Sequence, residues 1–363
     1  MSLVYQIALT LIKNIGPKQS KKLLEILGSA EAIFAASKEK LMKVEGIGKK
    51  ISTAILETDA ISRAQKQLDF IKKHQIQTLF YTEESYPRRL RDCEDAPVLL
   101  YFKGNINLNQ PRIVSVVGTR NATPYGKELV RKLIEALEPY NVLIISGLAY
   151  GIDVTAHKES LRIGIATVGV LGHGLDRVYP SMHTNVAKEM IRNGGLITEF
   201  LPGSAPEKEN FPKRNRIIAG LCDVLVVVEA SSKGGALITA DIANSYNKDV
   251  YAFPGRTNDE YSAGCNFLIK TNRAGLVSAP NDLIYYMGWS RDKLGTETRQ
   301  IQLPIELSDS ERQIIEILKI RTSGIDQISA QLTLSQSKIM MILLSLEMKG
   351  LIINLPGSRY ELA

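Results

Sequence analysis

A short segment of the chain combines cations with an aromatic ring. The stretch KENFPKRNR carries four cationic side chains and one ring, at Lys208, Lys213, Arg214, Arg216 and Phe211. Apolar residues 217–219 follow at once, so we expect these cations to be held against a folded core. Cations that hold a backbone beside a ring that stacks on a base are typical of sites for single-stranded nucleic acid. Arg214, Asn215 and Arg216 could instead fix the geometry of the loop, and for them both interpretations stay open.

Three further glycine-containing turns each follow an apolar, strand-like run and precede a helical pattern. Such a turn leaves the free N–H groups of the next helix facing an anion, and an arginine can bind a phosphate with two hydrogen bonds. The residues of these turns that we expect to contact phosphate are Gly118, Thr119, Arg120, Ser146, Gly147, Lys233 and Gly234. Asp153 follows the second turn, and we interpret it as a helix cap rather than a catalyst.

Several common cofactor and metal motifs are missing from the sequence. Seven residues separate Gly118 from the Gly126-Lys127 pair, and Glu128 stands where a Walker loop has Ser or Thr. Gly172-His173-Gly174 does not continue into a dinucleotide fingerprint. The three cysteines and four histidines are scattered, which disfavours a disulfide framework, a zinc site and a histidine catalyst. We therefore expect no cofactor, no metal and no catalytic residues.

The elements that must position these turns follow the rhythm of an α/β domain over residues 111–290. Six apolar runs are predicted as strands, at 113–118, 142–147, 167–172, 195–200, 224–230 and 249–255. Helix-length segments separate them. Continuous rather than alternating apolar strands indicate burial on both faces, which predicts a Rossmann-like, doubly wound and mostly parallel sheet. Ligands of such sheets bind at the carboxyl ends of the strands.

Residues 1–60 form a helical pattern with two glycine turns, at 15–18 and 44–50. Each turn precedes a helix and has lysines beside it, a pattern similar to a tandem helix-hairpin-helix (SAM-like) domain that grips nucleic-acid backbone. A small helical bundle that serves only as scaffold fits equally well. Residues 61–110 are interpreted as a connecting segment, with a helix over 60–73 and a strand over 78–81.

A polar linker, 291–306, precedes a C-terminal pattern of three helices and a hairpin over 307–363, which predicts a winged helix. Ser308 and Ser335 occupy expected N-cap positions. Winged helices commonly bind DNA through the third helix. Here that helix carries only Lys338 and Lys349 among many apolar residues, so contact with protein is an alternative role.

Charge and hydropathy narrow the class of protein. The formal net charge is +7, with nine lysines against six acidic residues in 1–60 and equal numbers of both signs in 307–363. A basic balance suits a polyanionic partner. No run of about eighteen apolar residues predicts a membrane helix, and the N-terminus resembles a first helix rather than a signal peptide. Unpaired cysteines are typical of a reducing cytoplasm, so we expect a cytoplasmic protein.

Four blocks together resemble the signature of the DNA-processing protein A (DprA, or Smf) family. They are GTR, SGLAYGID, K-x-x-F-x-x-RNRIIA and KGGALITA, within residues 75–290. The resemblance implies binding of single-stranded DNA, homodimerisation, and loading of a RecA-type recombinase in natural transformation. Block matching places Arg120, Lys208 and Phe211 at the main DNA contacts of the family, with Lys233, Arg214 and Asn215 as second choices. The apolar segment 282–289 either covers the sheet or contributes to the dimer.

Two rival functions remain at this point. The domain is also similar to nucleotide phosphoribohydrolases, whose PGGxGTxxE motif is matched by Gly234-Gly235. Leu237 and Ile238 replace its Gly-Thr pair, and Asp241 stands in the place of its glutamate. A transcriptional regulator acting through the winged helix is disfavoured by the zero net charge of 307–363.

Overall fold

A computed structural model of the chain describes residues 3–289, 307–320, 323–332, 334–355 and 359–362. The chain divides into two compact units, Met1–Asp292 and Lys293–Ala363, which are treated separately below. The expected linker, 291–306, lies outside the described residues. Within the described residues, no helix is both long enough and apolar enough to cross a membrane.

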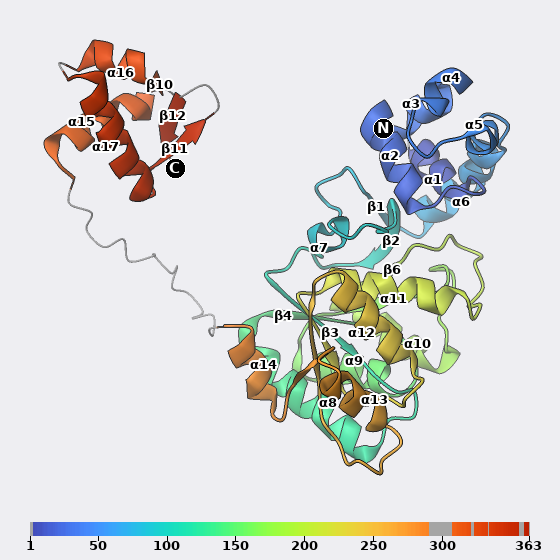
Figure 1. The fold of residues 1–363 in the computed structure, drawn as a ribbon. Helices are drawn as coiled ribbons and strands as arrows, with labels where there is room; N and C mark the ends of the chain where they lie inside the picture. The colour runs from blue at the N-terminus through green and yellow to red at the C-terminus, as the bar shows by residue number, and fades with distance from the viewer. Residues whose placement is uncertain (1–2, 290–306, 321–322, 333, 356–358, 363) are drawn as a thin grey trace. The chain divides into compact units, whose positions relative to one another are not determined.

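The larger unit opens with a bundle of six helices, coloured blue in Figure 1. They are α1 (Leu3–Leu11), α2 (Pro17–Leu27), α3 (Ala30–Ala35), α4 (Lys38–Met42), α5 (Lys49–Leu56) and α6 (Ala60–Lys73). Both glycine turns precede a helix as predicted, with Gly16 and Gly48 at the N-cap positions of α2 and α5. This arrangement confirms the tandem helix-hairpin-helix fold.

A nine-stranded sheet forms the body of the same unit. Its strands are β1 (Gln77–Phe80), β2 (Leu99–Gly104), β3 (Arg112–Val117), β4 (Val142–Ser146), β5 (Thr167–Val170), β6 (Gly194–Thr198), β7 (Val224–Val227), β8 (Asp249–Ala252) and β9 (Gly275–Leu276). Their order is β1-β2-β6-β5-β4-β3-β7-β8-β9. From β6 to β9 all pairs are parallel, while β1 and β2 pair antiparallel. All six predicted strands and the mostly parallel sheet are confirmed.

The segment 61–110 differs from the connecting segment that we expected, because it adds β1 and β2 to the edge of the sheet. Leu99 and Tyr101 pack into the core of the helical bundle, and Leu100 and Phe102 pack into the core of the α/β domain. The strand β2 therefore joins the core of the helical bundle to the core of the α/β domain. The turn-rich residues before it, which include the short helix α7 (Arg88–Arg91), hid this apolar run in the sequence.

Helices cover both faces of the sheet and bury alternate strand residues. The remaining helices of this unit are α8 (Pro124–Leu137), α9 (Ile152–Ile163), α10 (Thr184–Arg192), α11 (Asn210–Leu221), α12 (Gly235–Ser245), α13 (Ala263–Lys270), α14 (Pro280–Tyr286) and the 3-10 turns η1 (Glu138–Tyr140) and η2 (Ser181–His183). Val142 and Ile144 face α8 and α9, while Leu143 and Ile145 face α11 and α12. Burial on both faces explains why these strands are continuously apolar.

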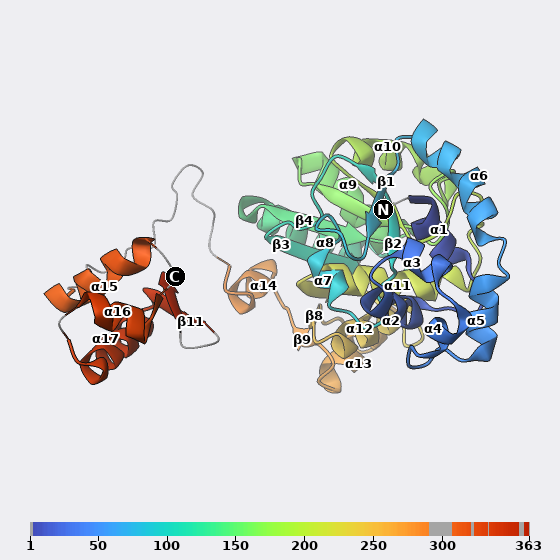
Figure 2. The same ribbon diagram turned by 90° about the horizontal axis from the view of Figure 1, so that it is seen from above.

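The chain winds outward from β3 in both directions, through β4, β5 and β6 on one side and β7, β8 and β9 on the other. Figure 2 views this unit along a second direction. The loops after β3 and β7 consequently diverge, which opens a crevice at the carboxyl ends of the strands.

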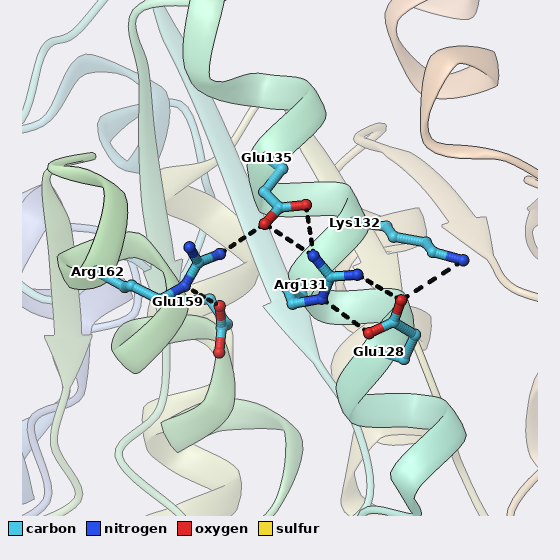
Figure 3. A network of polar contacts seen from close by, with 6 residues as sticks. All are labelled: Glu128, Arg131, Lys132, Glu135, Glu159 and Arg162. Atoms are coloured by element: carbon cyan, nitrogen blue, oxygen red, sulfur yellow. Dashed lines mark hydrogen bonds and ion pairs between the residues drawn. The ribbon is translucent and has the colours of Figure 1, made fainter.

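Helices α8 and α9 are joined on their outer side by a network of ion pairs, drawn in Figure 3. Arg131 contacts Glu128 at 2.5 Å and Glu135 at 3.0 Å, and Arg162 links Glu135 to Glu159, both at 2.7 Å. Lys132 approaches Glu128 at 3.6 Å. Each cation of this network therefore has a carboxylate partner within the protein.

The segment 282–289 contributes to the core and also exposes rings. Leu283 and Ile284 are buried in the cluster that contains α8, whereas Tyr285 is 81% exposed. Tyr286 stacks on Tyr251 of β8, with ring centroids 5.3 Å apart. Half of this segment covers the domain, and its tyrosines remain a candidate surface for a second copy.

The smaller unit has the winged-helix arrangement that the sequence predicts. Its elements are α15 (Asp309–Ile320), β10 (Ser323–Gly324), α16 (Ile325–Gln331), α17 (Gln336–Met348), β11 (Ile352–Leu355) and β12 (Arg359–Leu362), with strand order β10-β12-β11. Ser308 and Glu311 form a reciprocal capping box before α15, and Ser335 occupies the N-cap position of α17 without a capping hydrogen bond from its side chain. The third helix exposes four large apolar side chains, at Met340, Met341, Leu344 and Met348. This exposed face differs from the cationic face of a DNA-reading helix.

Candidate nucleic-acid interface

The loops that follow β3, β4, β6 and β7 surround an open groove with about 1760 Å³ of empty volume. Eight of the predicted site residues line it, namely Gly118, Thr119, Arg120, Lys208, Phe211, Arg214, Asn215 and Gly234. They come from three segments spread over more than a hundred residues of the sequence. The parallel sheet brings them together because all these loops leave from the same edge.

In the turn after β3, Arg120 is exposed to solvent. The backbone groups of Thr119, just before it, form hydrogen bonds within the protein. The Thr119 N–H donates to the Glu229 carbonyl at 2.7 Å, and the Thr119 carbonyl accepts from the Ile152 N–H at 3.1 Å. A Cβ at Gly118 would collide with Ile152. Gly118 and Thr119 therefore shape the turn, and Arg120 is the group of this turn that can hold an anion.

The N-terminus of α8 is not the open phosphate site that we expected from the turn before it. The Glu229 carboxylate accepts from the Thr123 N–H at 3.0 Å and from the Thr123 hydroxyl at 2.5 Å. Thr123 in turn caps α8 by accepting from the Gly126 N–H. Glu229 is 5% exposed, and a side chain at Gly126 would collide with it. A carboxylate of the protein thus fills this helix end, so anion binding here depends on the Arg120 side chain.

Phe211 and Lys208 lie at the start of α11 and just before it. We expected Phe211 in a loop; instead it occupies the first turn of α11, which fixes its ring more firmly. The Arg120 guanidinium carbon lies 5.5 Å from the centroid of the Phe211 ring. Arg120 and Lys208 are exposed, and neither forms an ion pair with any residue that the structure describes. A ring and two available cations therefore adjoin one another, as the sequence predicted.

Arg214 is buried, and its contacts favour the structural role among the two that the sequence left open. Its Nη1 donates to the Val170 carbonyl at the end of β5, at 2.6 Å. Burial lowers its pKa, and the neighbouring Asp153 opposes that shift. Burial raises the pKa of Asp153, and Arg214 opposes that shift. Gly147 separates the two side chains, where a Cβ would collide with both.

The neighbours of Arg214 have different positions. Arg216 donates to the Asp95 carbonyl and to the Glu199 carboxylate, and these contacts anchor α11 to the segment before β2 and to the loop after β6. Asn215 is half-buried and lines the groove. Of the three polar residues 214–216, Asn215 is therefore the remaining candidate for direct contact with a ligand.

Ser146 and Gly147 are not available to a ligand, which corrects our expectation for the turn after β4. The Ser146 hydroxyl is fully buried and donates to the Val116 carbonyl of β3 at 2.6 Å. The Gly147 carbonyl accepts from His157 Nε2 at 2.5 Å. The hydroxyl serves the sheet because a buried polar group needs an internal partner.

Buried histidines hold the loops around the groove. Besides its bond to Gly147, His157 contacts the Thr167 hydroxyl through Nδ1 at 2.7 Å. Burial lowers the pKa of His157 to about 4, so the ring is neutral near pH 7. His183 Nδ1 lies 3.0 Å from the Leu148 carbonyl. These histidines therefore position the backbone of residues 147–148.

The turn before α12 contains the last two predicted residues. Gly234 is the N-cap of α12 and lines the groove, while Lys233 is exposed beside it without lining it. Asp241, in the place of the glutamate of phosphoribohydrolases, forms an ion pair with Arg273 at 3.2 Å and does not line the groove. This position gives Asp241 no access to a nucleotide bound among the turns.

Two tyrosines that line the groove, Tyr179 and Tyr261, and a third in the turn after β4, Tyr150, were missed in the sequence. Tyr150 and Tyr179 are 45% and 47% exposed, and Tyr261 accepts a hydrogen bond from Asn121 at 3.0 Å. The Tyr179 and Phe211 ring centroids are 6.1 Å apart. Tyrosines in glycine-rich loops were the available signal, but only the fold places Tyr179 beside Phe211.

The two hairpins of the helical bundle use their lysines differently. In the first, Lys21 is 7% exposed and donates to the Cys93 and Glu94 carbonyls at 2.7 and 3.1 Å. Lys18 pairs with the Glu94 carboxylate at 2.5 Å. In the second, Lys49 and Lys50 are exposed. The lysines of the first hairpin thus contact other parts of the protein, whereas Lys49 and Lys50 of the second are exposed and form no ion pair with a described residue.

Comparison with known proteins relates these features to a family. The family model "DNA recombination-mediator protein A" matches residues 77–288. The "DprA winged helix domain" matches 299–358, and a "SAM-like Helix-hairpin-helix tandem" matches 7–58. Each of the three parts of the chain therefore matches a model of its own, in the order seen in the structure.

Two curated relatives are similar over much of their length. Protein Smf of Synechocystis is 32% identical and is aligned over 98% of both chains. The DNA processing protein DprA of Streptococcus pneumoniae is 41% identical over 56% of this chain and 71% of its own.

Two solved structures share the fold. The crystal structure of DNA processing protein A from S. pneumoniae superposes with a TM-score of 0.67 at 32% identity, over 78% of this chain and 97% of the other. DNA processing protein A from Helicobacter pylori, described for its single-stranded DNA binding mode, gives a TM-score of 0.54 at 29% identity, over 60% and 98%. With its sheet, its turns and its three matched parts, this chain is a member of the DNA-processing protein A (DprA/Smf) family.

Proposed function

We propose that the chain binds single-stranded DNA in the groove at the carboxyl edge of its sheet, without sequence specificity. Arg120 and Lys208 hold neighbouring phosphates, and Phe211 stacks on a base. The observation that carries the proposal is the pair of exposed cations, not ion-paired to any described residue, beside a fixed ring in one groove. The H. pylori relative, whose description names single-stranded DNA, supports the choice of ligand.

Lack of sequence specificity follows from the groups available. Phosphate contacts carry no sequence information, and every base offers a face for stacking. The winged helix presents methionine and leucine rather than cations on its third helix. We therefore expect single strands to bind more tightly than duplex.

A salt titration with a dT oligomer and a duplex of the same length tests this proposal. For single strands, the slope of log K against log salt is about −0.7 per phosphate contact, so a site of about four contacts gives roughly −3. An affinity independent of salt, or tighter binding to the duplex, would contradict the proposal.

We further propose that the protein delivers bound strands to a RecA-type recombinase in the cytoplasm, during DNA uptake or recombination, and is not itself an enzyme. Membership of the family supports this role. On single strands coated with a single-strand-binding protein, the DNA-dependent ATPase activity of the recombinase should begin after a shorter lag when this protein is present. Incubation with AMP should release no adenine, and a measurable release would favour the phosphoribohydrolase alternative.

Homodimerisation is the remaining part of the proposal. Strand β9 ends the described sheet, and an edge strand can pair with a second copy. Leu276 of β9 and Tyr285 of α14 are 43% and 81% exposed near this edge. Light scattering should show a dimer for the unaltered chain and a monomer for a folded Leu276→Lys/Tyr285→Ala variant. A variant that stays dimeric would place the interface elsewhere.

A further inference from the structure

The loop that connects β8 to α13 borders the groove and carries two carboxylates. This border loop comprises residues 254–262 and includes Asp259 and Glu260. Glu260 lines the groove and is exposed, whereas Asp153, the other carboxylate of the groove wall, is buried. A groove that we propose to hold a polyanion therefore has an exposed negative charge at its border.

Hydrogen bonds hold the border loop in place near both of its ends. The Asn266 side chain of α13 accepts from the Gly255 N–H at 3.2 Å and donates to the Gly255 carbonyl at 2.9 Å. The Tyr261 carbonyl accepts from the Ala230 N–H at 2.7 Å, and the Tyr261 hydroxyl accepts from Asn121 at 3.0 Å. The backbone that carries the two carboxylates is therefore tied to the turns after β3 and β7.

The two carboxylates have no internal cation that neutralises them. Asp259 and Glu260 are exposed, and neither forms an ion pair with a residue of the described ranges. Arg256 of the same loop is exposed too, but it lines a neighbouring hollow and not the groove. With one arginine against two carboxylates, the border loop has a net charge of −1. Glu260 is its charged side chain that reaches the groove.

A single strand and a duplex respond differently to a negative charge at a fixed position. A single strand is flexible, so it can leave the groove in a direction that avoids the carboxylates. A duplex has a persistence length of about 150 base pairs and carries one phosphate charge per about 1.7 Å of its axis. A duplex with one strand on Arg120 and Lys208 therefore brings further phosphates to the border of the groove and cannot bend them away. Like charges placed against one another are a common means of rejecting a wrong partner.

We propose that Glu260, together with Asp259, determines the preference of the groove for single strands, because these carboxylates repel the phosphates of a duplex. The inference rests on the proposed function and adds to it the groups that exclude the duplex. The bound single strand stays within the groove and makes no contact with Arg256 in the hollow beyond the border loop.

Neutralisation of both carboxylates in the full chain tests the proposal. The variant Asp259→Asn/Glu260→Gln keeps the size of both side chains and removes both charges. We expect the affinity for a duplex to rise about three- to twentyfold at low salt, and the affinity for a dT oligomer of the same length to rise less than about twofold. Because salt screens exposed charges, the gain for the duplex should shrink as salt is raised. Fluorescence anisotropy measures both affinities.

The control removes the same charges at the opposite edge of the same sheet. Glu138 and Asp249 are exposed and lie at the amino ends of β4 and β8. Glu138→Gln/Asp249→Asn should leave the ratio of the two affinities within about twofold, since distant charges are screened. Circular dichroism checks that both double variants are folded. An equal gain in the control, an equal gain for single strands and duplex, or no gain for the duplex would each overturn the proposal.

Arg256→Gln distinguishes this proposal from a longer path of the strand. If the strand crossed the border loop into the hollow, Arg256 would hold a phosphate there. Its loss would then weaken single-strand binding severalfold and make the salt slope shallower by about 0.7. The proposal expects an unchanged slope and an affinity within about twofold of the unaltered chain. A shallower slope would overturn it.

Failure of this inference and failure of the proposed function give different results. If the dT oligomer does not bind the unaltered chain, or binds the Arg120→Ala/Lys208→Ala variant equally well, the proposed function fails. If the oligomer binds through those two cations and neutralisation of the carboxylates leaves the ratio of affinities unchanged, only this inference fails.

Discussion

Two groups of cations on the same α/β domain differ in what their charges contact. On the outer side of α8 and α9, Arg131, Lys132 and Arg162 each have a carboxylate partner within 4 Å (Figure 3). At the groove, Arg120 and Lys208 are exposed with no ion pair among the described residues. The number of cations is similar in both places. Their availability differs, and availability decides where a polyanion binds.

Arg214 differs from both groups because it is buried. Its substitution should have the largest effect of those considered, and the effect is on stability. Arg214→Met removes the charge that most favours ionised Asp153, which is buried, and also removes the donor to the Val170 carbonyl. We expect unfolding to become easier by about 3–5 kcal/mol, measured by urea denaturation. Asn215→Ala is the neighbouring control and should leave stability nearly unchanged. If Arg214→Met is as stable as the unaltered chain but fails to bind DNA, Arg214 is a direct contact.

The groove cations should dominate affinity. The double variant Arg120→Ala/Lys208→Ala should lose roughly a hundredfold or more in affinity for single strands, since each charged hydrogen bond contributes about 1.5–3 kcal/mol. Its salt slope should be shallower by about 1.4, the value for two phosphate contacts. Salt titrations with one dT oligomer measure both quantities.

The controls for that double variant come from the paired cations and from the winged helix. Lys132→Ala and Lys338→Ala should each change affinity less than about twofold. If Lys338→Ala weakens binding while the Arg120→Ala/Lys208→Ala variant binds normally, the DNA site lies in the C-terminal unit.

Phe211→Ala should have a smaller effect of a different kind. The loss of base stacking should cost about 1–3 kcal/mol of binding free energy. The salt slope should stay nearly unchanged, because stacking releases no counterions. Phe211→Tyr keeps the ring and should bind within about twofold. A shallower slope for Phe211→Ala would mean that the ring only positions Arg120, which lies over it.

The contribution of the ion-pair network of α8 and α9 to stability should depend on pH, and breaking it should not change the affinity for DNA. Hydrogen bonds from Arg131 lower the pKa of Glu128 to about 2. The contribution of this pair to stability is therefore complete above the unfolded pKa of Glu, about 4.3, and is lost as pH falls towards 2. The melting temperatures of the unaltered chain and of Glu128→Gln should differ slightly at pH 6 and converge near pH 2. Affinity for single strands at pH 7 should be the same for both.

Much of the architecture followed from local pattern. The continuous runs at 142–147 and 224–230 predicted buried parallel strands because both faces of such a strand must be apolar. The strand β2 was missed, since charged and turn-forming residues 88–95 precede it and no helix separates it from β3, the next strand in the sequence. Its alternate packing into two cores is a property of the assembled domain.

The candidate site was predictable in part. Arg120, Lys208 and Phe211 were proposed from residue type and from resemblance to the family, and the sheet brings their loops to one groove. Ser146 was misinterpreted because a serine at the end of a strand can face either a ligand or a neighbouring strand. Glu229 at the α8 N-terminus went unnoticed, because it lies about a hundred residues from the helix that it caps. Tyr150 and Tyr179 gave no periodic signal in their loops.

The sequence by itself determined the family, the order of the three parts and the edge of the sheet at which the predicted site residues meet. These properties depend on turns, hydrophobic runs and short motifs that are local along the chain. The tertiary structure decided which charges are free. Arg214 and Lys21 resemble other exposed cations in sequence, yet both are buried against carbonyl groups contributed by distant segments. Because an ion pair or a buried hydrogen bond depends on distance in space, only the folded chain separates the cations that hold the protein together from those that are left free for a ligand.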